Sequence, residues 1–209
     1  MKSVTVVIPV YNPNREWFEA CLASVPQDRV DVIICDDCSD TPVPEATIRH
    51  ERNTGPAESW NSCIELATTK WIAPLGHDDS FDSEGLSELL NVIDEVDADL
   101  IHFPVRVFPG PWIWKCEDAR LESMLQGNCI PGTTWMTKEA WQRNGKYQYV
   151  LCEDWDFLLR AAKTGMRFHY FPRILYNYRS DSHGYYETVV VPNEEKIRKD
   201  MREKYGSEK

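Results

Sequence analysis

The amino-acid sequence predicts an α/β domain built on a mainly parallel central sheet, and three observations lead to this prediction. Short β-branched runs alternate with amphipathic segments through the first half of the chain, as in sheets whose parallel strands are joined by helices. Three of these runs end in polar clusters, at 11–12, 36–37 and 77–79, and open α/β sheets bind ligands beyond the carboxyl ends of their strands. The length of 209 residues fits one domain with a substantial core.

Each element has its own justification. Residues 4–10 form a β-branched run that ends in turn residues, and apolar side chains then repeat at helical spacing between Trp17 and Leu22. Pro56 stands at the start of a later helix, where its missing N–H costs nothing. Up to residue 107 the predicted elements are strands at 4–10, 30–35, 71–75 and 100–107, and helices at 15–24, 57–67 and 83–96.

The pattern changes after residue 108. Irregular connections are expected around 109–114 and 127–134, helices at 137–144 and 152–163, a short strand at 173–178, and a charged helical tail from residue 193. We therefore predict a single domain over 1–209, with a first part over 1–107 and a smaller C-terminal part over 108–209.

Composition excludes several classes of protein. The 23 Lys and Arg residues against 34 Asp and Glu residues give a net charge of −11, which argues against nucleic-acid binding through the overall field. The 8 Trp, 9 Tyr and 7 Phe residues supply too much apolar surface for a disordered chain. The first ten residues lack the features of a signal peptide, and no run approaches the ~18 apolar residues of a membrane span. We expect a cytoplasmic protein without its own membrane anchor.

The seven cysteines are odd in number and scattered along the chain, unlike the disulfide framework of a secreted protein. Cys35 and Cys38 form a lone C-x-x-C without a second pair or a nearby pair of histidines. We interpret them as two buried or half-buried thiols rather than as a zinc or redox site.

Two acidic segments could carry chemistry. His77, Asp78 and Asp79 follow a predicted strand, and carboxylates there suit Mg²⁺ or Mn²⁺, although they could equally cap the next helix. Glu153 and Asp154 open an amphipathic helix, where the helix dipole favours acids and where a carboxylate could also serve as a general base.

Two further polar groups receive plainer interpretations. Asp156 and Arg160 are four residues apart, and we expect an ordinary ion pair on the helix surface. Arg179 and His183 follow the last predicted strand. A single histidine is usually structural or exposed, so His183 is only a candidate ligand by itself.

Five segments taken together carry a resemblance to a known family. They are VVIPVYN at 6–12, IICDDCS at 33–39, NTGP at 53–56 with Asn61, LGHDD at 75–79, and CEDWD at 152–156 with Leu159 and Arg160. In this order they resemble the family 2 glycosyltransferases, which have the GT-A fold and invert the configuration of the transferred sugar. The resemblance extends from residue 4 to about residue 183. It makes 1–107 the nucleotide-sugar-binding half and 108–209 the acceptor-binding half with a C-terminal helix.

The resemblance implies site residues one by one. The matching positions for the nucleotide are Pro9, Tyr11, Asn12, Asp36, Asp37, Asn53, Gly55, Asn61 and His77. Those for a divalent metal, Mn²⁺ or Mg²⁺, are Asp78, Asp79 and His183. Asp154 matches the base that deprotonates the acceptor hydroxyl, and Glu153 lies beside it. The implied donor is a nucleoside-diphosphate sugar, with a UDP-hexose expected, and the implied acceptor is a saccharide, lipid-linked or protein hydroxyl.

Two departures from the family pattern keep alternatives open. Gly76 stands where the family commonly has the first Asp of its D-x-D motif, and the acceptor half is short. One alternative is a catalytically degenerate GT-A-like module that binds sugar nucleotides. The other is a sugar-phosphate nucleotidyltransferase, but these favour a Gly-rich basic segment after the first strand, where this chain has residues 11–15, YNPNR.

Overall fold

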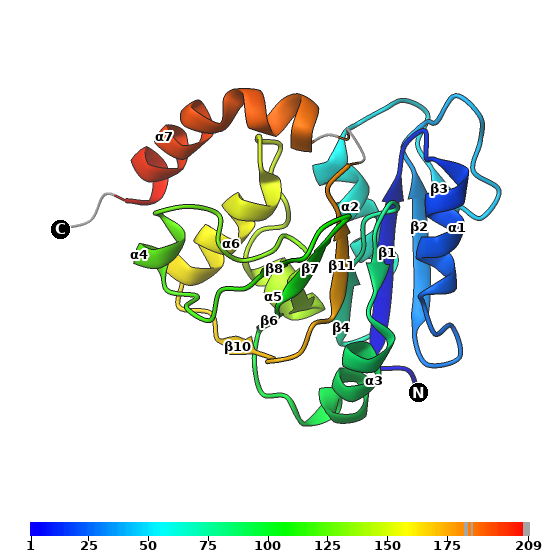
Figure 1. The fold of residues 1–209 in the computed structure, drawn as a ribbon, viewed down its shortest axis with the longest axis horizontal. Helices are drawn as coiled ribbons and strands as arrows, with labels where there is room; N and C mark the ends of the chain where they lie inside the picture. Colours follow the sequence, from blue (N-terminus) through cyan, green and yellow to red (C-terminus); the bar gives the residue numbers. More distant parts are fainter. Residues whose placement is uncertain (182–183, 185, 207–209) are drawn as a thin grey trace.

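The structure is a computed structural model that describes residues 1–181, 184 and 186–206 (Figure 1). A seven-stranded sheet has the order β10-β6-β9-β4-β1-β2-β3. Its strands are β1 (Val4–Val10), β2 (Asp31–Asp36), β3 (Ile48–Arg49), β4 (Trp71–Pro74), β6 (Leu100–His102), β9 (Trp135–Thr137) and β10 (Phe168–Tyr170). All neighbouring pairs are parallel except those of β9, which runs antiparallel to β4 and β6. The predicted fold class, an α/β domain with a mainly parallel central sheet, is confirmed.

The strand β1 lies in the middle of the sheet because its side chains are apolar on both faces. Val6 and Ile8 belong to one buried cluster and Val7 to another on the opposite face, and all three side chains are fully buried. A strand covered on both faces needs such a continuous apolar run. Val7 pairs with Ile33 of β2 and with Pro74 of β4, so the carboxyl ends of the three strands lie next to one another.

Helices cover both faces of the sheet (Figure 1). The first three are α1 (Arg15–Ala23), α2 (Pro56–Leu66) and α3 (Ser83–Val92), and α3 continues into the short 3-10 helix η1 (Ile93–Glu95). The side chains of Asn14 and Asp82 cap α1 and α3 by accepting from backbone N–H groups, which satisfies donors that a helix start leaves free. Pro56 opens α2 as the sequence indicates.

A second sheet has the order β5-β11-β7-β8, and its strands are β5 (Ser80–Phe81), β11 (Tyr176–Arg179), β7 (Val105–Phe108) and β8 (Trp112–Trp114). The prediction of a single strand over 100–107 is therefore wrong. It divides at 103–104 into β6 and β7, which pair in different sheets. A continuous apolar run contains no local signal for such a change of partner. The strands β8, β9 and β10 also lie where the sequence predicted none, because each has only three residues and depends on its neighbours for stability.

The C-terminal half is helical around β9 to β11. It contains α4 (Leu121–Met124), α5 (Lys138–Arg143), α6 (Glu153–Lys163), the π-helical η2 (Tyr186–Val190), the 3-10 helix η3 (Val191–Asn193) and α7 (Glu194–Tyr205). The prediction of an ion pair on the surface of α6 is wrong about its location. Asp156 does pair with Arg160, but Asp156 is completely buried. Its carboxylate accepts from Arg160 at 2.9 Å, and from Lys204 and Tyr205 of α7 at 2.6 Å each. This buried charge thus pins the C-terminal helix onto α6.

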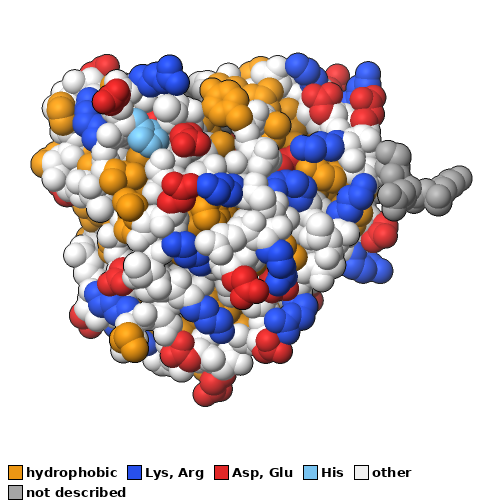
Figure 2. All heavy atoms as spheres, turned by 180° about the vertical axis from the view of Figure 1, so that it is seen from behind, with side chains coloured by type: hydrophobic (Ala, Val, Ile, Leu, Met, Phe, Trp, Pro, Cys, Tyr) orange, Lys and Arg blue, Asp and Glu red, His pale blue; other side chains and the backbone are white. Residues whose placement is uncertain are grey.

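The surface carries both signs of charge. Figure 2 shows acidic and basic side chains interspersed over the face seen from behind, with small separate apolar patches. Among the described residues, no helix combines the length and the apolar character that a bilayer crossing requires.

Candidate active site

The polar ends of three parallel strands are joined by hydrogen bonds. The backbone N–H of Asp37, after β2, donates to the carbonyl of Val10 in β1 at 2.8 Å. The backbone N–H of Asn12 donates to the hydroxyl of Ser39 at 2.9 Å. After β4, Nδ1 of His77 lies 3.3 Å from the carbonyl oxygen of Pro9. The structure therefore brings the predicted nucleotide-binding segments to one edge of the sheet.

Asp37 organises the loop that precedes α2. Its Oδ1 atom contacts His50 Nδ1 at 2.7 Å and accepts from the backbone N–H and hydroxyl of Thr54, while Oδ2 accepts from the backbone N–H of Gly55 at 2.8 Å. Burial acts to raise the pKa of Asp37, but the hydrogen bonds from His50, Thr54 and Gly55 outweigh it and hold the pKa below its ordinary value. Gly55 has a φ of 85°, which glycine adopts without strain. Asp37 is thus an ionised anchor whose Oδ2 atom retains acceptor capacity.

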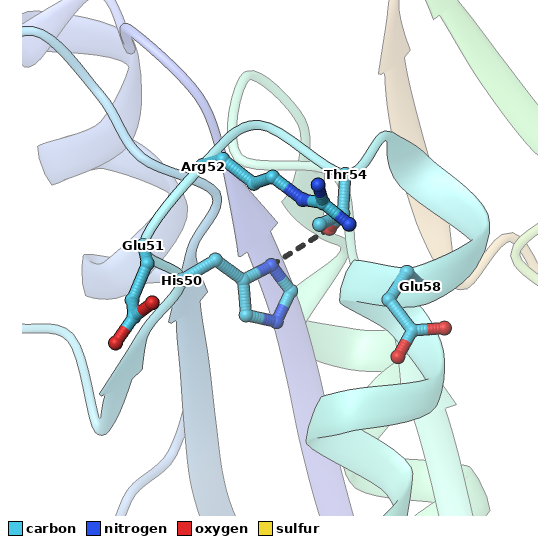
Figure 3. Close-up of a pocket in the computed structure, with 5 residues that line it drawn as sticks. All are labelled: His50, Glu51, Arg52, Thr54 and Glu58. Atoms are coloured by element: carbon cyan, nitrogen blue, oxygen red, sulfur yellow. Dashed lines mark hydrogen bonds between the residues drawn. The ribbon is translucent and has the colours of Figure 1, made fainter.

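A pocket of about 500 Å³ opens beside this network and is lined by His50, Glu51, Arg52, Thr54 and Glu58 (Figure 3). Figure 3 shows the His50 ring between Glu51 and Glu58, with Arg52 above it. The other ring nitrogen, Nε2, lies 2.9 Å from the hydroxyl of Ser62 in α2. His50 therefore contacts Asp37 and Thr54 through Nδ1 and α2 through Nε2.

Of the remaining residues predicted to bind the nucleotide, some are buried beside the site and others are exposed at its rim. Asp36 is fully buried and accepts from the backbone of Ser39 and Val43 and from the Arg49 guanidinium. Asn61 is buried in α2, where its amide accepts from Trp141 Nε1 at 3.1 Å and donates to the carbonyl of Tyr147 at 3.0 Å. These two side chains shape the fold around the site.

By contrast, three of the predicted residues are exposed at the rim: 46% of Tyr11 is accessible, and Asn12 and Asn53 are exposed as well. Asn12, with a φ of 45°, has its amide paired with Asp40: Nδ2 donates to Oδ2 at 3.2 Å, and Oδ1 accepts from the backbone at 2.8 Å. Pro9 is partly buried beside His77.

The acidic loop after β4 is held by β11. Asp79 is buried, and both its carboxylate oxygens have partners: Tyr176 donates from its hydroxyl to Oδ2 at 2.9 Å, and Arg179 from its backbone N–H to Oδ1 at 2.7 Å. The Tyr176 hydroxyl in turn accepts from the backbone N–H of Gly76 at 2.8 Å. Burial, reinforced by the Asp78 charge, raises the pKa of Asp79 to about 8. Asp79 therefore shapes the loop, and Asp78 remains partly exposed beside it.

The space around position 76, where the family commonly has an Asp, is too small for a side chain. A Cβ at this position would lie 2.5 Å from Oδ2 of Asp79 and 3.2 Å from Oδ1 of Asp78. The position of the Asp79 carboxylate beside the Tyr176 hydroxyl is therefore compatible only with glycine at position 76.

Arg179 clamps the same loop from the other side. Its guanidinium lies 4.4 Å from the ring centroid of Trp17 in α1 and 4.5 Å from that of Phe108 in β7, which are distances of favourable cation–π contact. Its Nε donates to the carbonyl of Asp78 at 3.1 Å. One side chain thus joins α1, the small sheet and the acidic loop.

The Glu153–Asp154 pair adjoins α2 and the loop before it. Trp60 of α2 interacts favourably with the ionised form of Glu153, and the ring of Tyr149 lies over Gly55. Burial raises the pKa of both acids, and burial together with the neighbouring Asp154 charge raises the pKa of Glu153 to about 8. The start of α6 and the start of α2 therefore adjoin.

The side chain of Asp154 fits closely against its neighbours. Asn128 interacts favourably with its ionised side chain, and a Cβ added to Gly132 would lie 2.9 Å from its Cγ and overlap Oδ2. Neither residue carries a signal in the sequence, since both lie in a segment predicted as irregular connection. Tyr176 and Trp60 were missed for another reason. The partner of Tyr176 lies 97 residues away and that of Trp60 lies in another helix, so no local pattern indicates either contact.

A metal site built from protein ligands alone is absent among the described residues, where no three His, Cys, Asp or Glu side chains gather to hold an ion. Mg²⁺ commonly binds one or two carboxylates and completes its shell with water and substrate phosphates. Asp78 is partly exposed and fits that donor set, whereas Asp79 is buried and held by Tyr176 and by the backbone of Arg179. The candidate ligand His183 lies outside the described residues.

Comparison with known proteins agrees with the family resemblance seen in the sequence. A sequence model of the family described as "Glycosyl transferase family 2" matches residues 5–136. An uncharacterized glycosyltransferase of Haemophilus influenzae is 29% identical over 192 residues, 77% of this chain and 62% of that protein. The succinoglycan biosynthesis protein ExoO of Rhizobium meliloti is 30% identical over 109 residues, 46% of this chain and 31% of that protein. The chain thus spans less than two thirds of the length of either relative.

Among solved structures, S. aureus TarS 1-349 in complex with UDP-GlcNAc matches with a TM-score of 0.73 at 18% identity, covering 90% of this chain and 61% of that one. At this identity the likeness concerns the fold. The family match covers more than half of the chain and includes the strand ends that hold Asp37 and Asp78. The chain belongs to glycosyltransferase family 2.

Proposed function

We propose that this chain is an inverting, divalent-metal-dependent glycosyltransferase that moves a sugar from a nucleoside-diphosphate sugar to a hydroxyl acceptor. One observation carries the proposal: the loop that Asp37 anchors through Gly55 leads into α2, and α2 is bonded through Asn61 to Tyr147, whose ring packs on α6, the helix that begins with Glu153 and Asp154. The anchor for the nucleotide and the candidate base are thereby connected through one rigid element. The UDP-GlcNAc bound to the TarS structure supports a UDP-hexose as the donor.

The nucleotide lies, in this proposal, along the ends of β1 and β2. Tyr11 and Asn53 at the rim contact the base or ribose, together with Pro9, Asn12 and Gly55. Asp37 accepts a hydrogen bond from the base through the remaining capacity of Oδ2. Asp36, Asn61 and His77 support the pocket from within, since their polar groups bond to protein atoms.

Asp78 is the residue that would hold a divalent cation, Mn²⁺ or Mg²⁺, with diphosphate oxygens. When bound, such an ion stabilises the negative charge that grows on the leaving diphosphate. Asp79 keeps Asp78 in place, because its carboxylate is fixed by Tyr176 and by the backbone of Arg179.

Asp154 accepts the proton of the attacking hydroxyl. Burial raises its pKa, which makes the ionised carboxylate a stronger base. Glu153 shares the same apolar surroundings, and its pKa of about 8 leaves it protonated at neutral pH. Two carboxylates this close do not both ionise readily. The proton on Glu153 therefore leaves the negative charge to Asp154, and inversion places that base opposite the leaving diphosphate.

The test combines substrate scope with one variant. We expect the chain to transfer sugar from a member of a panel of UDP-, GDP- and dTDP-sugars, with Mn²⁺ and not with EDTA. Asp154→Asn should abolish transfer and leave UDP affinity within about twofold, because the amide cannot accept the proton. Asp97→Asn, which changes a largely exposed acid, is the matched control. Binding of UDP-sugars without any transfer would instead identify a binding module, and transfer by Asp154→Asn would refute the base.

A further inference from the structure

Two cysteines that are distant in the sequence meet in the structure. The thiol sulfurs of Cys116 and Cys129 lie 2.8 Å apart, and both side chains are half-buried. A disulfide bond has an S–S length of about 2.05 Å, so a small movement of the side chains would bring the two sulfurs to bonding distance.

The two cysteines bring together the two ends of a compact loop, residues 116–129, and these adjacent ends form its neck. Residues 116–129 leave the small sheet just after β8, form α4 and return toward β9. At the neck, Trp114 Nε1 donates to the carbonyl of Cys129 at 2.7 Å, and the Cys116 thiol donates to the carbonyl of Asp118 at 3.3 Å. The bond from Trp114 holds the two ends of residues 116–129 against each other, and the two thiols are in contact there.

The loop of residues 116–129 contacts the helices α6 and α7. Trp155 Nε1 of α6 donates to the carbonyl of Met124 at 3.1 Å, and Arg198 of α7 donates to the carbonyl of Gln126 at 2.9 Å. In Figure 1, α4 lies beside α6 on the side away from β1. A covalent link at the neck would therefore restrain a segment on which α6 and α7 rest.

We propose that Cys116 and Cys129 form a reversible dithiol–disulfide pair that is oxidised by exchange with a low-molecular-weight disulfide such as oxidised glutathione. In the first step a Cys116 thiolate attacks the small disulfide, forming a mixed disulfide and releasing one thiolate. In the second step Cys129 attacks the Cys116 sulfur of the mixed disulfide. Its proton passes to the second departing thiolate. The two protein thiols are oxidised by two electrons, and one small disulfide is reduced to two thiols.

The order of attack follows from the surroundings of Cys129. Burial and the neighbouring Cys116 thiol raise the pKa of Cys129 to about 12, so it remains a thiol at neutral pH and acts second. Cys35 and Cys63 also interact, but both side chains are fully buried, which excludes a small disulfide from reaching them in the folded chain.

The bond should stabilise the folded chain. It closes a short loop and removes conformational freedom from the unfolded state, with little distortion because the sulfurs are already adjacent. For a chain of this size we expect Tm of the oxidised form to exceed that of the reduced form by about 5–10 °C.

The experiment exposes the full folded chain to oxidised glutathione, followed by alkylation, peptide mass spectrometry and thermal unfolding. We expect a peptide linked through Cys116 and Cys129, a higher Tm, and reversal of both by dithiothreitol. Cys38→Ser, which removes another half-buried thiol, should behave like the parent.

Cys116→Ser and Cys129→Ser should each lose the linked peptide and the rise in Tm, and their reduced forms report whether they fold. Mass spectrometry of the parent chain does not depend on either variant. Glutathione adducts at these positions without a 116–129 link, or a linked form with unchanged Tm, would overturn the proposal. None of these readouts requires sugar transfer.

Discussion

The hydroxyl of Tyr176 donates a 2.9 Å hydrogen bond to Oδ2 of Asp79, which lies 97 residues earlier in the chain. Together with the backbone N–H of Arg179, this bond engages the whole carboxylate of an acid that the sequence indicates as a metal ligand. The strand β11, near the C-terminus, thereby sets the shape of the acidic loop that follows β4. The position of Asp78, the available carboxylate, depends on that shape.

We first predict that Tyr176→Phe lowers the free energy of unfolding by about 1–3 kcal/mol, because it leaves buried partners on Asp79 and Gly76 without their hydrogen bonds. Urea unfolding at pH 7 measures the change. Tyr149→Phe, at a side chain that is 82% exposed, should alter the same quantity by less than about 0.5 kcal/mol. Equal effects of the two substitutions would contradict the structural role of the Tyr176 hydroxyl.

Restoring the family's acid at position 76 should impair this chain. A side chain there would lie 2.5 Å from Oδ2 of Asp79, so Gly76→Asp and Gly76→Ala must both displace the Asp79 carboxylate. We expect lower transfer and lower unfolding free energy for both variants, measured as kcat with Mn²⁺ and by urea unfolding. Higher activity of Gly76→Asp would show that the loop rearranges to accept a further ligand.

The seat of Asp154 gives a prediction about geometry. Gly132→Ala pushes the carboxylate away, since the new Cβ would overlap Oδ2, and a displacement of about 1 Å can reduce catalysis roughly 100-fold. We expect kcat to fall by about this factor with UDP affinity unchanged. Gly127→Ala is the control in the same loop, where the new Cβ meets only the flexible guanidinium of Arg198. Loss of UDP affinity in Gly132→Ala would point to a wider disturbance.

His102 should make stability depend on pH. Its side chain is buried in β6, and burial lowers its pKa to about 4, although a hydrogen bond with the backbone of Cys116 opposes this. An unfolded histidine has a pKa of about 6.5, so the unfolded chain binds more protons between these values and stability falls as pH decreases from about 6.5 to 4. The full contribution, about 3 kcal/mol, is present above pH 6.5.

Comparison with His102→Phe isolates this contribution from that of the carboxylates, which titrate in both proteins. The replacement ring retains aromatic contact with Phe168 and Tyr170. We expect the unfolding free energy of the parent to fall more steeply than that of the variant across this pH range, in urea titrations at fixed salt. Parallel pH profiles would show that folding leaves the pKa of His102 unchanged.

The sequence by itself determined the elements whose cause is local. The β-branched run of β1, the capping side chain of Asn14 and the first-turn position of Pro56 act on neighbouring residues, so the first strand, α1 and α2 could be predicted. The polar ends of β1, β2 and β4 could be placed together as well, because parallel strands have a common direction. Asp37 and Asp78 follow from that rule.

Tertiary structure decided what depends on partners far along the chain. It divided residues 100–107 between two sheets, buried Asp156 against Lys204 and Tyr205, and gave Asp79 its partners in β11. Local patterning describes how one segment divides its apolar and polar faces. Which carboxylate remains open to a ligand depends instead on which donors the closed chain brings within hydrogen-bond distance, and that is a property of the whole packed molecule.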